Sequence, residues 1–182
     1  MKKYQNSTIA QMYIQLKICK LSRNGYGNLN KDSFYWVFDA QPTPLSKKYR
    51  ILIIFHKDIY APRAYIVSND ITKLSQAPHL YDSKKIQLCL YYPDGKEWTK
   101  NDPLCNTIIA WIYLWLYYYE EWQYSGIWKG GGTHPSQKDE SKEKKLSPLK
   151  KIRGNKKPKK KNNTLSNYIN RIYKREQNKL NL

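Results

Sequence analysis

The chain has 182 residues and 3 cysteines, so we expect one domain with one core, a tail, and at least one thiol left unpaired within the chain. The start MKKYQNSTIA lacks the apolar core of a signal peptide, which favours a reducing cytoplasm. No CxxC or clustered His/Cys spacing is present, so we expect neither a metal nor a cofactor.

A first helix is predicted after Thr8, which is a suitable N-cap with Gln11 three residues later, as in a capping box. Ile9, Met12, Leu16 and Cys19 then recur at near-helical spacing. We expect this apolar stripe to pack on a sheet, with Cys19 as a core residue. The helix should end before Asn24-Gly25, and Gly25 and Gly27 predict a loop.

Three antiparallel strands are predicted next, at 34–40, 49–56 and 64–68, because β-branched and aromatic residues dominate there. Prolines interrupt the chain between them. The run Ile51–Phe55 is apolar without alternation, which indicates a strand covered on both faces. His56 ends this strand and is interpreted as a structural or surface residue.

The candidate chemistry lies between Pro78 and Trp98. His79 precedes Cys89 by ten positions, and Cys89 lies in or just past a short extended segment at 86–92. A deprotonated thiol is the best nucleophile among ordinary side chains, and a fixed polar group nearby can stabilise the charge formed when it attacks a carbonyl. Cysteine is also a common small core residue, and a histidine beside a proline often marks only a turn, so both interpretations stay open here.

A long helix is predicted after Asp102, as N-cap, and Pro103, at the first helical position. The following LCNTIIAWIYLWLYYYEEW is apolar almost all round, so we expect burial on more than one side or a covering partner. We expect no membrane contact, although the uncharged run of 17 residues from 103 to 119 is long enough to permit a span as the competing interpretation. Cys105 is interpreted as core, with a second reactive thiol as the alternative.

Polar groups after this helix are further candidates. Glu120 and Glu121 either bring a carboxylate near Cys89 or are two solvated acids. The segment WKGGGTHP then joins a glycine run to a His-Pro end, which suits close approach of another chain. His134 either supplies a donor or base beside Cys89 or is a loop histidine.

The tail carries most of the charge. Residues 136–182 hold 16 Lys and Arg against 4 acids, whereas residues 1–135 hold 17 against 10, and the total is +19. We therefore divide the chain into a domain at 1–135 and a basic, largely disordered tail at 136–182. Apolar residues at helical spacing predict a short helix at 164–180, and folding of this helix on a partner is one alternative.

The order of these elements resembles the ubiquitin-conjugating enzyme fold, in which a His-Pro-Asn signature stands ten residues before the catalytic cysteine and a tryptophan and a helix follow it. His79-Leu80-Tyr81 stands where His-Pro-Asn would, Cys89 falls at the matching spacing, and Trp98 follows. The strands look like its meander, with Tyr60-Ala61-Pro62 similar to its proline-bearing loop.

The closer resemblance, covering Thr8 to about Trp122, is to the stand-alone bacterial conjugating-enzyme-like proteins of short type II CBASS antiphage operons. It is carried by PHLY, LCLYYP, EW, TIIAWIYLWLYYYEEW and the later GIWKGGGTHP. Tyr81 replaces the asparagine of the signature, and the proline precedes the histidine. The Tyr81 hydroxyl, His79 or backbone N–H groups would therefore have to support an oxyanion.

The resemblance implies an α+β, ubiquitin-conjugating-enzyme-like fold with an N-terminal helix, an antiparallel strand meander, an active-site loop, a long aromatic helix and a basic C-terminal tail. It also implies a cytoplasmic acyl carrier. Cys89 would form a thioester with the C-terminus of a cyclic GMP-AMP synthase-like nucleotidyltransferase and pass it to an amine or similar nucleophile, priming antiphage signalling. His79, Tyr81 and His134 would support Cys89.

Several alternatives stay open. The chain lacks a nucleotide-binding glycine motif, so either a separate activating enzyme loads Cys89 or the thiol reacts directly with the partner. An inactive conjugating-enzyme variant that acts as a binding module is a rival reading, which Tyr81 favours. A nucleic-acid-binding protein that uses the basic tail is another.

Overall fold

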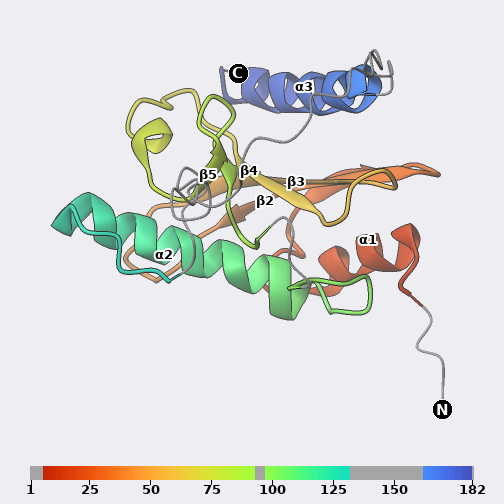
Figure 1. Cartoon of the computed structure of the whole chain (residues 1–182), viewed down its shortest axis with the longest axis horizontal. Coiled ribbons are helices and arrows are strands. Elements are labelled where there is room, and N and C mark those ends of the chain that lie inside the picture. Colours follow the sequence, from red (N-terminus) through yellow and green to blue (C-terminus); the bar gives the residue numbers. More distant parts are fainter. Residues whose placement is uncertain (1–5, 93–96, 132–161, 182) are drawn as a thin grey trace, which may run out of the picture.

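A six-stranded antiparallel sheet with helices on both faces makes up the part of the chain that the computed structural model describes, namely residues 6–92, 97–131 and 162–181. The strand order is β1-β2-β3-β4-β6-β5. In Figure 1 the sheet is the middle layer, with α3 on one side and α1 and α2 on the other. This arrangement confirms the expected mixture of helices and antiparallel sheet.

The elements follow one another along the chain as α1 (Ile9–Ile18), β1 (Tyr26–Leu29), β2 (Ser33–Ala40), β3 (Tyr49–His56), β4 (Arg63–Ile66), a 3-10 turn (Leu74–Gln76), β5 (Leu80–Asp82), β6 (Gln87–Leu88), a π-helical turn (Cys105–Ile109), α2 (Ala110–Ser125), α3 (Asn162–Asn178) and a second 3-10 turn (Lys179–Asn181).

The capping box predicted for α1 is present. The Thr8 hydroxyl accepts a hydrogen bond from the Gln11 backbone N–H at 3.2 Å, and the Gln11 side chain accepts one from the Thr8 N–H at 2.8 Å. These two bonds satisfy donors that the first helical turn leaves open. Met12 and Leu16 are buried, so the apolar stripe of α1 packs into the main core as expected.

Strand β3 is covered on both faces, as its unbroken apolar run predicts. Ile51, Ile53 and Phe55 belong to a core shared with α1 and α2. Leu52 and Ile54 point the other way, into a second core completed by α3. Alternate residues of a strand point to opposite faces, so both sets must be apolar when both faces are buried.

Gly25 lies in the loop before β1, as expected, but Gly27 lies within the edge strand β1, so the predicted loop was wrong there. Gly27 pairs with Trp36 of β2. A Cβ atom at Gly27 would lie 2.1 Å from the Tyr35 carbonyl oxygen and 2.9 Å from the Trp36 ring. The glycine therefore permits the close approach of β1 to a large aromatic side chain, a common reason for glycine within a strand.

The long aromatic helix is present, but Asp102 is not its N-cap. The Asp102 carboxylate accepts hydrogen bonds from the Thr99 backbone N–H at 2.6 Å and from the Thr99 hydroxyl at 2.9 Å, which closes the turn before the helix. The helical segment starts with the π turn and continues as α2, which ends at Gly126 with φ 72°.

Helix α2 is buried along one face only by the described part of the chain, so burial on more than one side is not seen there, and the alternative of a covering partner stays a prediction. Ile112, Trp115 and Leu116 are buried, whereas Leu114 is 50% exposed and Tyr124 is 95% exposed. Over the described ranges, no helix has the length and apolar character needed to cross a bilayer.

Cys19 and Cys105 form a disulfide, which corrects their interpretation as two core thiols. Cys19 is buried, as expected, but its sulfur is bonded to a residue 86 positions away. The end of α1 packs against the start of the π turn and brings the two Cα atoms to 5.7 Å, within the usual range for a disulfide. Composition and spacing alone do not reveal such a tertiary contact.

Helix α3 lies in the region where a short helix is expected. Ile169, Ile172 and Tyr173 are buried against the sheet's second face, so the helix packs on the sheet of its own chain. The basic segment before it lies outside the described residues, and the division at residue 135 stays a prediction.

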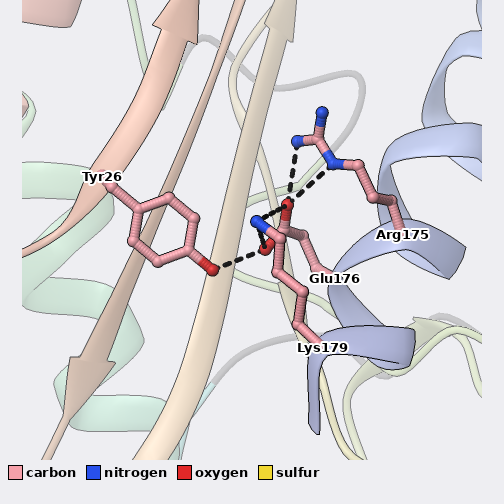
Figure 2. Close-up of polar contacts among 4 residues, drawn as sticks. All are labelled: Tyr26, Arg175, Glu176 and Lys179. Atoms are coloured by element: carbon pink, nitrogen blue, oxygen red, sulfur yellow. Dashed lines mark hydrogen bonds and ion pairs between the residues drawn. The ribbon is translucent and has the colours of Figure 1, made fainter. Parts of the chain in front are cut away.

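A buried carboxylate anchors the end of α3 to β1 (Figure 2). The fully buried Glu176 side chain accepts hydrogen bonds from the Tyr26 hydroxyl at 2.6 Å, from Arg175 at 2.8 Å and from Lys179 at 3.1 Å. Burial alone would raise the pKa of Glu176, but these bonds together lower it below the ordinary 4.5. Burial and the bond to Glu176 raise the pKa of Tyr26 to about 12.

Candidate functional site

Cys89 directly follows the short strand β6, at the end of the sheet that α2 covers. All three cysteines lie within the described ranges, and Cys89 is the one with a free thiol. Its backbone N–H donates to the His79 carbonyl oxygen at 2.9 Å, and its side chain is partly exposed. The structure thus brings together the histidine and the cysteine that stand ten positions apart in the sequence.

His79 contacts this region through both its backbone and its ring. Its carbonyl oxygen also accepts a hydrogen bond from the Trp115 indole N–H at 3.0 Å, which joins the loop to α2. The imidazole stacks on Trp128, with ring centroids 5.1 Å apart. His79 has φ 56°, in the left-handed region, and the residue before it is Pro78. This strained backbone aims the carbonyl at Cys89 and Trp115.

Tyr81 stands close enough to Cys89 for its hydroxyl to lower the pKa of the thiol. Its hydroxyl also donates to the Tyr91 carbonyl oxygen. Because a hydroxyl has one proton, it must leave the Tyr91 carbonyl in order to donate to a Cys89 thiolate. Tyr81 thus lies where a hydroxyl can stabilise negative charge beside the sulfur.

The surroundings of Cys89 favour the neutral thiol. Burial raises the pKa of Cys89 above its ordinary 9.0, the hydrogen bond to Tyr81 lowers it, and the charge of Glu97 raises it further. The net direction is upward because desolvation penalises the thiolate more than the single hydrogen bond stabilises it. A resting Cys89 is therefore mostly protonated at neutral pH.

A small groove of about 120 Å³ opens at Cys89, and we call it the Cys89 groove. Its walls come from the His79 loop, from α2 and from the segment after α2, and include Leu90, Leu114, Tyr118 and Trp128. Gly130 and Gly131 line its rim. The Trp128 indole N–H is buried and has no hydrogen-bond partner in the part of the chain that the structure describes.

The two described glycines of the run WKGGG differ in what surrounds them. A Cβ atom at Gly130 would lie 2.7 Å from Trp128 Nε1 and 2.8 Å from the Tyr118 ring, whereas one at Gly131 would meet nothing within 4 Å. Gly130 is therefore needed for the backbone to lie against the two rings. Because Trp128 stacks on His79, this contact connects the glycine run to the loop that holds Cys89.

A larger cavity of about 1220 Å³ lies on the other side of Tyr81 and Tyr91, between the strands β4 to β6 and the start of α3. Its lining is mixed, with polar residues such as Arg63, Lys85 and Asn170 beside apolar ones such as Ile59 and Ile169. Lys85 is paired with the carboxylate of Asp82 at 2.9 Å. Tyr81 lines this cavity, whereas Cys89 lines the smaller groove.

The other sequence candidates do not meet at Cys89. Glu120 accepts hydrogen bonds from the Ser46 and Tyr49 hydroxyls, and Glu121 pairs with Lys129 at 2.9 Å. His134 lies outside the described residues, so its role stays a prediction.

Trp115 and Trp128 are site residues that the sequence reasoning did not single out. Trp115 is a tryptophan on the buried face of α2, and such residues are more often core than functional. For Trp128, the one feature of the sequence that could have indicated a role in the site is its position close before the glycine run.

Fold and site together define an α+β protein with one free, partly buried thiol held between a histidine loop and an aromatic helix. The family model of the type II CBASS E2 protein matches residues 14–135, more than half of the chain. The chain therefore belongs to the family of type II CBASS E2 proteins, which gives it an E2-like role in CBASS and conjugating activity in general. A search of curated proteins found no match.

Proposed function

We propose that this protein is an acyl carrier that forms a thioester between Cys89 and the C-terminus of a cyclic GMP-AMP synthase-like nucleotidyltransferase, and then transfers that acyl group to an amine or similar nucleophile. The family supports an E2-like role, and the CBASS context supports a nucleotidyltransferase partner. The observation that carries the proposal is the environment of Cys89, a free thiol that opens into a groove beside a hydroxyl donor.

The chemistry requires few groups, because a thioester is already activated. The Cys89 thiolate attacks the carbonyl carbon of an activated donor, a C–S bond forms, and the donor's leaving group departs with its electron pair. In the second step an amine attacks the same carbon, a C–N bond forms, the C–S bond breaks, and the sulfur leaves as thiolate. The amine's proton passes to solvent or to a nearby base.

Each residue around Cys89 has a defined place in this proposal. The Tyr81 hydroxyl donates to the thiolate, and then to the oxyanion of the tetrahedral intermediate if the carbonyl lies within its reach. His79 is a positioning residue, since its carbonyl accepts from the Cys89 N–H and its ring contacts Trp128. His134 is proposed as a further donor or base on the strength of its place in the sequence.

The experiment that tests this is co-expression with the nucleotidyltransferase encoded beside this protein, comparing the wild type with Cys89→Ser and Cys89→Ala. We expect a covalent adduct that thiol reductants remove from the wild type, a reductant-stable ester with Cys89→Ser, and no adduct with Cys89→Ala. The absence of adduct from all three proteins, even with an activating enzyme and ATP present, would leave a binding module as the better description.

A further inference from the structure

The Cys89 groove combines a reactive sulfur with walls that carry no formal charge. Among the described residues that line it, none is Asp, Glu, Lys or Arg, and most are aromatic or aliphatic. Leu114 is half exposed at its edge, and Tyr118 and Trp128 form the wall that Gly130 covers. A group that enters the groove therefore meets apolar surface and no carboxylate, ammonium or guanidinium group of the described residues.

We infer that the groove selects the acyl donor by an aliphatic or aromatic side chain lying within the last few residues before the reacting carbonyl. This inference rests on the proposed function, because the donor's carbonyl must reach the Cys89 sulfur. It goes further in assigning a side-chain preference to the donor. A charged side chain in that place would lose its hydration with no compensating ion pair, whereas an apolar one gains by leaving water.

The volume of the groove agrees with one such side chain. An apolar protein cavity of about 150 Å³ holds a benzene molecule, and the Cys89 groove measures about 120 Å³. A leucine or phenylalanine side chain is of this size. Because the groove is open to solvent at its rim, an aromatic ring that is slightly larger than the groove can extend out of it. Small polar donors would leave the aromatic walls unfilled.

Short peptide thioesters test the preference without the natural partner. Ac-Ala-X-Gly thioesters of mercaptoethanesulfonate, with X as Leu, Phe, Asp or Lys, are mixed with the full-length protein, and intact-mass spectrometry follows adduct formation. In the expected exchange the Cys89 thiolate attacks the thioester carbon, the new C–S bond forms, and mercaptoethanesulfonate leaves with the electron pair of the old one. The Leu and Phe donors should react at least about tenfold faster than Asp and Lys, a difference of about 1.4 kcal/mol.

A charge placed at the rim should reverse this order. Leu114→Glu is expected to make the Lys donor faster than the Leu donor, because the new carboxylate gives the lysine a partner. Leu114 is half exposed, so the substitution removes little core packing. Tyr124→Glu is the matched control, since Tyr124 lies on the same helix, is almost fully exposed and does not line the groove, and its variant should keep the wild-type order.

The outcomes separate the two proposals. Equal rates for all four donors, with the adduct on Cys89 and absent from Cys89→Ala, would overturn the side-chain preference and leave the acyl carrier standing. A preference that persists unchanged in Leu114→Glu would also overturn it, because the groove would then not be its source. If no donor gave an adduct on Cys89, both the proposed acyl-carrier function and the proposed side-chain preference would be contradicted.

Discussion

The Cys89 thiol is subject to opposing influences that its reactivity should reveal. Burial raises its pKa, and the hydrogen bond to the Tyr81 hydroxyl lowers it. Because the thiolate is the reactive species, alkylation of the native protein by iodoacetamide should accelerate with rising pH through and beyond the ordinary thiol value of 9.0. Cys19 and Cys105 are joined in a disulfide, so without reductant the measurement reports Cys89 alone.

Tyr81→Phe should move that profile further towards high pH. The change removes a hydroxyl that lowers the pKa of the Cys89 thiol, so that pKa should rise. The apparent pKa is read from the alkylation rate between neutral and strongly basic pH. Tyr124→Phe serves as control, because Tyr124 is exposed and away from Cys89. An unshifted profile in Tyr81→Phe would show that the hydroxyl does not act on the sulfur.

At the residue scale, the sequence allowed the pairing of His79 with Cys89 to be predicted. It did not allow the prediction of contacts that depend on the tertiary fold. The ten-residue spacing of His79 and Cys89 does correspond to a contact, between backbone atoms. The stacking of His79 on Trp128 was not predictable, because it joins residues far apart along the chain and depends on how the segment after α2 folds back. The disulfide was missed for the same reason.

At the scale of elements, the segment after α2 controls the shape of the groove. Gly130→Ala should slow thioester formation about threefold to tenfold, since a Cβ atom there forces Trp128 or Tyr118 to move at a cost of about 1 kcal/mol. Gly131→Ala should behave like the wild type, because a Cβ atom there meets nothing. The Trp128 indole N–H resonance, followed by NMR, checks that the ring has moved. Equal rates in both variants would mean that this packing does not matter for the reaction.

The anchoring of α3 depends on Glu176. Glu176→Gln should lower the free energy of unfolding by about 1 to 3 kcal/mol, because hydrogen bonds to a charged acceptor are lost. The pKa of Glu176 is lowered in the folded protein, so its contribution is present above pH 4.5 and is lost as the pH falls through the lowered value. Stability should therefore fall on acidification in the wild type and less so in the variant.

Urea unfolding at neutral and acidic pH makes this measurement. Glu121→Gln is the matched control, because the Glu121–Lys129 pair lies at the surface and such pairs contribute about 0 to 1 kcal/mol. If both variants lost the same small amount, α3 would be held by its apolar residues and not by the buried carboxylate.

Among the elements, β2, β3 and the cap of α1 were the most predictable, because local chemistry determines them. The run Tyr49–His56 has bounds identical to β3, and its lack of alternation indicates its two covered faces. The edge strand β1 was less predictable, since Gly25 and Gly27 are typical of turns. Here both glycines leave room for the side chain of Trp36, which lies on the neighbouring strand.

At the scale of the whole molecule, the disulfide closes a long stretch of chain. Replacing both cysteines, as Cys19→Ala with Cys105→Ala, should lower the free energy of unfolding by about 2 to 4 kcal/mol while leaving Cys89 alkylation unchanged. Alkylation of the urea-unfolded wild type should add one label without reductant and three with it. Three labels without reductant would show that Cys19 and Cys105 are not bonded in the isolated protein.

The two covered faces of β3 also set an order for biosynthesis. A ribosome makes β3 and the strands around it more than a hundred residues before Ile169 and Tyr173 of α3. Until those residues are made, Leu52, Ile54 and Val67 form an uncovered apolar surface on the nascent sheet. Such a surface is a binding site for chaperones and a source of aggregation. The second face of the sheet is therefore covered only after α3, near the end of the chain, has been synthesised.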